Sequence, residues 1–417
     1  MFGIFLALFF AGVLILIVCL TVERREQNVI IILLLLGYFS RLLIRCFNRN
    51  LDFLSNGQTL GGGDAINYEA VAREIAALWE ITGVHFVKNP EIDVGFAPLH
   101  HNLLAVIEYC NGYYSGLGAV STSAFIACLG MFFLYKIYII YDFKRKTSHF
   151  VILTLLFCPS FLMYTSDSFK EGTLVFFVIS IFALLFHITS RNFYFVIPCI
   201  VMLFFGLFET RYYLVYLLIP PIVVFLFQKQ IKKLFDFGIF FAFFCLCLLM
   251  AVFLFFLWCN FDFFSNTLIG SFVIQKWNYF IYISGALQAD NIYSGGSLIS
   301  LDGINPTLET FPVKILYTIL SPFPWQGGSF ALHLSKIEMF FWCFILYWTC
   351  RGIKGLLIQD PVRVLMLLSF IVPLILIYSW SFTNIGQIYR QRIVIFFVAS
   401  ILAVWGRVAA KQKAQVS

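Results

Sequence analysis

Charged residues are scarce in this sequence. Of its 417 residues only 12% are charged, whereas 61% are hydrophobic and the mean hydropathy is +0.92. Soluble globular proteins are about 45–50% apolar and about 25% charged. A water-soluble fold cannot bury so much apolar surface, so the composition excludes the soluble classes and requires lipid around the chain. The net charge of +7 does not indicate nucleic acid, because Lys and Arg residues of membrane proteins gather in cytoplasmic loops.

The sequence also lacks the motifs of several enzyme classes. None of its 11 Cys residues forms a CxxC pair or a Cys/His ligand set, which favours small buried hydrophobic side chains over a zinc site. It contains no P-loop, no Gly-x-Ser-x-Gly and no His-Glu-x-x-His motif. His100 and His101 are adjacent and no third ligand is evident, so we expect neither a metal nor another cofactor.

Long hydrophobic runs are what the sequence has instead. Because the hydrocarbon core of a bilayer is about 30 Å thick, a helix needs about 20 apolar residues to cross it. This length predicts an all-α polytopic integral membrane protein, a single transmembrane domain over residues 1–417 with about eleven transmembrane helices. These helices are expected near residues 2–20, 28–48, 117–140, 149–165, 172–189, 193–208, 212–228, 238–258, 337–350, 362–380 and 389–406. The first lacks the features of a cleaved signal peptide and is expected to be retained.

The basic residues predict the orientation. If the hairpin at Arg24 and Arg25 is cytoplasmic, the other basic clusters of the short loops fall on the same side, as the positive-inside rule requires. The N-terminus is then outside and the C-terminus inside. The other clusters are Lys144 to Lys146, Arg191, Lys229 with Lys232 and Lys233, Arg351 with Lys354, and Arg407 with Lys411 and Lys413.

Two long loops then lie on the outer side, near residues 49–116 and 259–336. Loops of this length are usually functional or disordered. In the first loop, residues 65–79 predict an interfacial helix whose polar positions include Arg73 and Glu74. The second loop is rich in aromatic residues, which favour an ordered loop against the membrane. The residues expected on the apolar side of the interfacial helix are Ile66, Ala70, Ile75 and Leu78.

The few charges outside the cytoplasmic clusters gather at the outer ends of helices. Charges near hydrocarbon are expensive and indicate functional sites. Asp64 follows three glycines, Gly61 to Gly63, and begins the interfacial helix. The glycines let the backbone turn sharply, and Asp64 suits two roles there, that of a helix cap and that of a catalytic base.

The segment 166–172 carries three more charges. Lys170 suits a phosphate group, and Asp167 or Glu171 suits a sugar hydroxyl. The alternative is a solvated hairpin with a local Asp–Lys pair, which contributes less than about 1 kcal/mol.

Three arginines stand at further outer boundaries. Arg211, which follows Glu209, has a planar guanidinium that suits phosphate oxygens, and the alternative is an anchor that snorkels to the interface. Arg390 and Arg392 open the last span on the outer side, against the positive-inside trend. We expect either a diphosphate or the carboxylates of the outer loops to compensate their charge.

The first of these segments resembles a known enzyme family. Arg41 late in the second span, followed by Gly63-Asp64-Ala65 and Tyr68, is similar to the first outer loop of GT-C-type glycosyltransferases. Those enzymes use polyprenyl-phosphate donors and place an acidic residue in that loop. Because Asp64 is followed by Ala65, the chain lacks the acidic pair that many of them carry, and a metal-dependent mechanism is not expected.

Other segments resemble a broad group of bacterial surface-polysaccharide membrane proteins that includes the O-antigen polymerases. The group's pattern is matched in segments that together extend over most of the chain. They are Pro159-Ser160 to Lys170-Glu171, Pro322-Phe323-Pro324-Trp325, and Asn384-Ile385-Gly386 with Arg390 and Arg392.

The resemblance implies polymerisation of polyprenyl-diphosphate-linked oligosaccharide repeat units, of O-antigen or capsule type, at the periplasmic face of the bacterial inner membrane. Arginines would stabilise the leaving diphosphate without a metal, and a carboxylate would deprotonate the acceptor hydroxyl. The expected catalytic residues are Asp64, Glu171 and Asp167. The residues expected to bind the diphosphate or the sugars are Lys170, Arg211, Arg390, Arg392, Glu209, Tyr68 and Arg41.

The expected partners are the lipid-linked oligosaccharides, membrane lipid and a chain-length regulator protein, and no nucleic acid. Two alternatives stay open. One is a GT-C-like transferase of single sugars from a polyprenyl-phosphate donor, and the other is a flippase or other transporter of lipid-linked oligosaccharides. A transporter is expected to show repeated halves and charges near mid-membrane, whereas the charges here stand at outer boundaries.

Overall fold

The computed structural model describes residues 2–48, 64–95, 97–112, 115–142, 145–188, 192–238, 310–326, 330–381 and 385–416. Within these ranges every regular element is an α-helix. Several expectations lie outside the described residues: the glycines at 61–63, the span near 238–258, most of the second outer loop, and the basic residues Lys144 and Arg191 together with Asn384.

The described helices are those of a polytopic membrane protein. Seven are long and apolar enough to cross a bilayer, and a bent pair makes an eighth candidate. The expected count of eleven is not confirmed, partly because α9 (Glu171–His187) has only 17 residues and α10 (Phe193–Leu226) joins two expected spans. The other long helices are α1 (Phe2–Thr21), α2 (Arg24–Asn48), α6 (Gly116–Tyr138), α16 (Phe330–Gln359), α17 (Pro361–Ser381) and α18 (Ile385–Val416).

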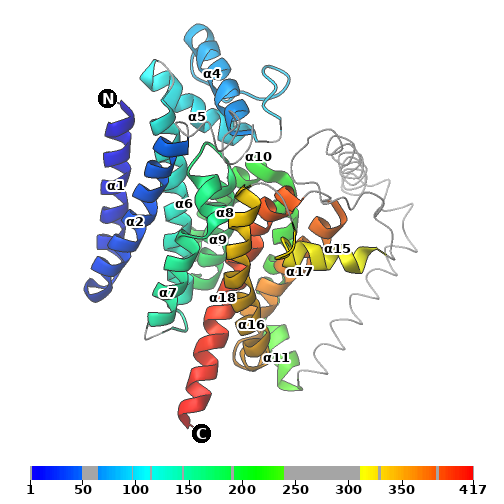
Figure 1. Ribbon diagram of the computed structural model, residues 1–417. Helices are drawn as coiled ribbons and strands as arrows, with labels where there is room; N and C mark the ends of the chain where they lie inside the picture. The colour runs from blue at the N-terminus through cyan, green and yellow to red at the C-terminus, as the bar shows by residue number, and fades with distance from the viewer. Residues whose placement is uncertain are drawn as a thin grey trace, which may run out of the picture.

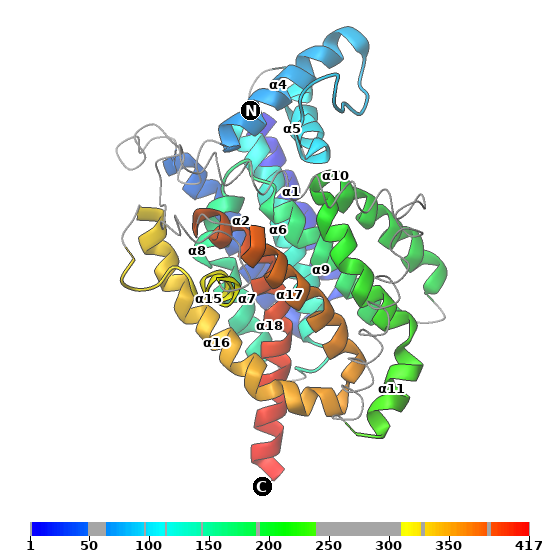
Figure 2. The same cartoon turned by 90° about the vertical axis from the view of Figure 1, so that its right-hand side faces the viewer.

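Helix α18 is the centre of the bundle, and α1 lies at its edge (Figures 1 and 2). In the apolar stretch of α18, 83% of the residues are buried, against 28% in α1. Helices α6, α9, α16 and α17 pack around α18. The exposed side of α1 carries Phe5, Leu8 and Phe9, as expected of a surface that lipid covers.

Two helices of the first outer loop lie together at one end of the bundle (Figure 1). Helix α4 (Asp64–Thr82) corresponds to the helix expected at 65–79, whereas α5 (Pro98–Asn111) was not expected. The expected apolar face is partly wrong, because Ile66 is exposed and Glu69 is buried. The reason is that α4 packs on α5 and on the bundle, where Glu69 meets a buried arginine.

The basic clusters lie at the opposite end. Figure 1 shows the α1–α2 hairpin, the start of α7 (Lys146–Leu156), α11 (Gln228–Asp236) and the C-terminus away from α4 and α5. This separation is the one that the expected topology requires. The orientation itself, with the N-terminus outside, stays a prediction.

The expected break at Pro159 is present. Helix α7 and α8 (Pro159–Thr165) are bent by 56° at this point. The bend leaves carbonyls without helical partners, and Arg41 of α2 binds one of them, that of Leu156. The fully buried Arg41 donates to the Leu156 carbonyl at 3.1 Å and to Thr165 Oγ1 at 2.6 Å. Arg41 therefore stabilises the broken helix, and the structure does not place it among the outer charges.

Candidate functional site

The break in α10 places Arg211. Its backbone is extended, with φ −159° and ψ 87°, between helical residues 193–210 and 212–226. The side chain is buried, and Nη1 donates to the Tyr213 hydroxyl at 3.0 Å. Its Nη2 lies 3.8 Å from Oε1 of Glu171. A non-helical residue thus brings the guanidinium to the first residue of α9.

Glu171 lies between two arginines. Its carboxylate stands at the N-terminus of α9, where the helix dipole favours negative charge. Nε of Arg390, in the second turn of α18, donates to Oε1 of Glu171. The Arg390 guanidinium also lies 4.8 Å from the centre of the Phe169 ring and 5.5 Å from that of Tyr164. Glu171 is buried, so its charge is committed to the two arginines.

Asp64 and Tyr68 approach the same arginine from α4. Oδ2 of Asp64 accepts a hydrogen bond from Arg390 Nη1 at 2.5 Å, and Nη2 lies 3.5 Å from the Tyr68 hydroxyl. Nζ of Lys170 is 5.6 Å from the centre of the Tyr68 ring. We call Asp64, Tyr68, Lys170, Glu171, Arg211 and Arg390 the cation cluster.

The net charge of the cation cluster depends on Lys170. With Lys170 protonated, three basic and two acidic side chains leave a formal charge of +1, that is 3 minus 2, and with Lys170 neutral the charges balance. Burial and the neighbouring Arg211 lower the pKa of Lys170 to about 7, although Glu171 opposes the shift. Asp64 has a side chain that is 59% exposed, whereas that of Glu171 is 4% exposed. The site therefore suits an anion, with one accessible carboxylate at its rim.

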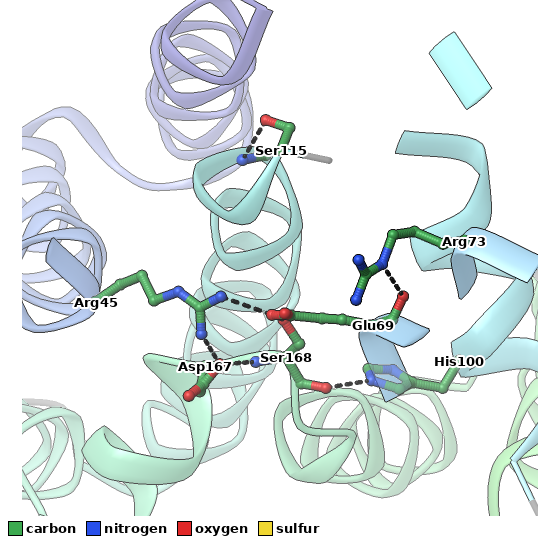
Figure 3. Close-up of polar contacts among 8 residues, drawn as sticks. Arg45, Glu69, Arg73, His100, Ser115, Asp167 and Ser168 are labelled. Atoms are coloured by element: carbon green, nitrogen blue, oxygen red, sulfur yellow. Dashed lines mark hydrogen bonds and ion pairs between the residues drawn. The ribbon is translucent and has the colours of Figure 1, made fainter. Parts of the chain in front are cut away.

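A second ionic group, the Arg45 cluster, consists of Arg45, Glu69, Asp167 and Ser168 (Figure 3). Arg45 binds Asp167 through Nη1 and Glu69 through Nη2, the latter at 2.6 Å. Ser168 donates to both carboxylates, from Oγ to Glu69 at 2.6 Å and from its backbone N–H to Asp167 at 2.8 Å. All four side chains are buried, so Arg45 ties α2 to α4 through Glu69 and to the α8–α9 connection through Asp167, which is 1% exposed and has no access to a substrate.

His100 and His101 border both clusters. The ring of His100 donates from Nε2 to the Ser168 carbonyl at 2.9 Å (Figure 3). Both imidazoles meet the edge of Tyr68, with centroids 5.3 and 5.1 Å away. Burial lowers the pKa of His100 to about 3 and that of His101 to about 4, so both are neutral at pH 7. Among the described residues no three His, Cys, Asp or Glu side chains could hold a metal ion.

Arg392 does not join the cation cluster, contrary to expectation. Two residues after Arg390 on a helix, it points in a different direction. Nη1 donates to the carbonyls of Ile319 at 3.1 Å and Ser321 at 2.5 Å, where α15 (Phe311–Leu320) ends. Arg392 is 1% exposed, so its charge stabilises the end of a helix and does not face a ligand.

Glu209 is also placed differently from the other expected site residues. It forms an ion pair at 2.5 Å with Lys88, from the connection between α4 and α5. The glutamate is buried, whereas the side chain of Lys88 is 51% exposed. Glu209 precedes Arg211 by two residues on α10.

Sequence reasoning missed Arg45, Glu69, Lys88 and the role of the histidines. Arg45, like Arg211, is a cation at the expected outer end of a span, so the sequence did contain a signal for it. Glu69 is next to Tyr68 in the sequence, but it pairs in its buried position with Arg45, which is 24 residues away. Lys88 lies in a connection whose path the sequence does not indicate.

Comparisons of the chain with protein-family models, with curated proteins and with solved structures find no match. The cation cluster is the part of the described structure whose side chains indicate a function. They form a buried group, with three basic members, that can bind an anion, and an exposed carboxylate pairs with its most central arginine.

Proposed function

We propose that this protein is a membrane-embedded glycosyltransferase that polymerises polyprenyl-diphosphate-linked oligosaccharides at the periplasmic face of the bacterial inner membrane. The observation that carries the proposal is the cation cluster. Lys170 at the N-cap of α9, Arg211 of α10 and Arg390 of α18 lie around the buried Glu171, at the end of the bundle that holds α4 and α5. Three basic side chains gathered at one place favour an anionic partner, and a lipid diphosphate is such a partner.

The cations suit the departure of a diphosphate. When the bond between sugar C1 and the diphosphate oxygen breaks, the electron pair goes to the leaving oxygen. Arg211 and Arg390 present planar donors that bind phosphate oxygens in pairs, and Lys170 adds a compact charge. Stabilising the developing charge in a dry site is an electrostatic contribution that needs no reorganisation.

Asp64 is the carboxylate best placed to act as the base. Among the three expected catalytic acids it is the one with an exposed side chain. The acceptor hydroxyl loses its proton to Asp64 as its oxygen forms the new bond to C1. While Asp64 is paired with Arg390, its Oδ2 accepts a hydrogen bond from that arginine. A diphosphate that takes over Arg390 releases Asp64, so the donor prepares the base for the acceptor.

Glu171 and Tyr68 have positioning roles in this scheme. Glu171 holds Arg211 and Arg390 through the same oxygen, Oε1, and the two arginines keep its carboxylate ionised despite its burial. Tyr68 contributes its ring to Lys170 and its hydroxyl to Arg390. Neither side chain needs to exchange a proton with the substrate.

The proposal is tested with purified protein in lipid nanodiscs and a polyprenyl-diphosphate-linked oligosaccharide. The wild-type protein is expected to convert it to a ladder of longer chains with release of polyprenyl diphosphate. Asp64→Asn is expected to lower the rate about 10²–10⁴-fold, the usual contribution of a general base. The matched control is Asp236→Asn, an exposed aspartate on α11 at the opposite end of the bundle, which is expected to leave the rate unchanged.

The outcomes separate the three functions considered. A ladder supports the polymerase, whereas addition of one sugar from a polyprenyl phosphate supports the single-sugar transferase. Movement of the lipid between leaflets with no product supports a transporter. A ladder of equal rate from Asp64→Asn would contradict the assignment of the base.

A further inference from the structure

The Lys88–Glu209 pair is surrounded by exposed aromatic residues. Nζ of Lys88 lies 5.3 Å from the ring centre of Phe86 and 6.0 Å from that of Phe205. Phe86 is 40% exposed and Phe205 is 60% exposed. We call Phe86, Lys88, Phe205 and Glu209 the Lys88 patch. It combines a cation with apolar surface, which is the chemistry of a lipid headgroup region.

One side of the Lys88 patch belongs to a membrane-spanning helix. Phe205 and Glu209 are one turn apart on α10, and Val201 and Met202 below them are also exposed. These residues form the lipid-facing side of the helix. The connection from α4 to α5 lies above α10 in both views (Figures 1 and 2), and Lys88 joins it to Glu209. The connection therefore lies against the exposed apolar side of α10.

The other side of the Lys88 patch leads to the cation cluster. Glu209 precedes Arg211 by two residues, and Arg211 binds Glu171. Along α10 the Lys88–Glu209 pair is thus followed within two residues by Arg211, which shares Glu171 with Arg390.

We propose that the Lys88 patch is the surface through which a polyprenyl diphosphate lipid reaches the cation cluster from the outer leaflet. This inference deepens the proposed function and depends on it for the identity of the lipid. Lys88 contacts the diphosphate, and Phe86 and Phe205 contact the first isoprenoid units. Glu209 holds Lys88 against α10 when no lipid is bound, and the diphosphate replaces it.

The experiment is photo-crosslinking of an alkyne-labelled polyprenyl diphosphate in vesicles of phosphatidylethanolamine and phosphatidylglycerol. Benzoylphenylalanine replaces Phe205 or, as the matched control, Phe195, which is also exposed on α10 but near its other end. The label is expected at position 205 and not at 195. Alkyne-labelled phosphatidylglycerol is expected to label both positions equally.

Affinity measurements distinguish a direct contact between Lys88 and the lipid from a purely structural role of the Lys88–Glu209 pair. Lys88→Ala is expected to weaken binding about fivefold, as the loss of one basic residue at a headgroup does. Glu209→Gln is expected to keep or increase the affinity, because it leaves Lys88 available. The control Lys232→Ala, an exposed lysine on α11, is expected to have no effect.

Three results would overturn the proposal. They are equal labelling at 205 and 195, equal labelling of position 205 by both lipids, and a loss of affinity in Glu209→Gln that matches Lys88→Ala. Because these measurements read binding and not transfer, they are distinct from the test of the proposed function. A ladder without selective labelling refutes the access route alone, and labelling without a ladder refutes the polymerase alone.

Discussion

Lys170 is the residue whose charge is most sensitive to its surroundings. Burial and the nearby Arg211 lower its pKa from 10.5 to about 7, although Glu171 opposes the shift. The folded protein therefore binds fewer protons than the unfolded chain between about pH 7 and 10.5, and this group's contribution to stability rises with pH there. Without a ligand the folded protein disfavours the protonated amine of Lys170. A bound diphosphate favours it, because opposite charges attract.

Binding of polyprenyl diphosphate is accordingly expected to depend on pH. Above about pH 7 binding takes up a proton at Lys170, so the affinity falls by up to about tenfold per pH unit. Lys170→Arg keeps the charge over this range and is expected to remove that part of the dependence. Titration of nanodisc-embedded protein with the lipid between about pH 6 and 9 measures both slopes. Equal slopes in the two proteins would show that Lys170 does not contact the anion.

The individual charges were predictable from the sequence, but their partners were not. Asp64, Lys170, Arg211 and Arg390 stand out because charges near hydrocarbon are costly, and the structure brings these four together around Glu171. Arg392 has the same sequence signal and lies elsewhere. Because Arg390 and Arg392 are two residues apart on a helix, their side chains point in different directions. The packing of α18 determines which of the two faces the cation cluster.

At the scale of elements, buried arginines stabilise the ends of interrupted helices. Arg41 binds the Leu156 carbonyl where α7 bends into α8, and Arg392 binds the carbonyls of Ile319 and Ser321 at the end of α15. The hydrocarbon region holds no water that could donate hydrogen bonds to unpaired carbonyls. A buried arginine can donate these hydrogen bonds instead. The sequence indicates the break through Pro159, but not which distant cation satisfies it.

Arg392→Met is expected to lower stability without changing ligand affinity. The substitution leaves the carbonyls of Ile319 and Ser321 without that donor, at about 1–3 kcal/mol. Thermal unfolding in detergent measures the loss, and Arg351→Met, at an exposed arginine of α16, is the control. Normal stability together with a loss of diphosphate binding would instead show that Arg392 belongs to the diphosphate-binding site.

At the scale of the whole molecule, the two ends of the bundle differ in charge and in shape. One end carries α4, α5 and the cation cluster, and the other carries α11, the C-terminus and the basic hairpins. Hydropathy alone predicted the helical membrane class. It did not predict α5 or α15, because short helices at an interface have neither the length nor the composition of a span.

The expected topology is tested with reporters fused to the chain ends. With the C-terminus cytoplasmic, a C-terminal fluorescent protein is expected to fluoresce, and a C-terminal alkaline phosphatase is expected to be inactive. A phosphatase inserted in the 83–95 connection is expected to be active. The reverse pattern would place the cation cluster inside and remove the periplasmic assignment.

The Arg41 contacts also constrain how the chain is assembled. Arg41 lies in α2, and its partners Leu156 and Thr165 follow 115 and 124 residues later. Chains grow at about 5–20 residues per second, so α2 waits about 6–25 s for these partners. Arg41 can meanwhile donate to the Gly37 carbonyl of its own helix, and Arg45 can meet Glu69, which follows it by only 24 residues. Arg41 therefore completes its contacts only after α8 has been made, and no nascent chain that ends before Ser168 can complete the Arg45 cluster.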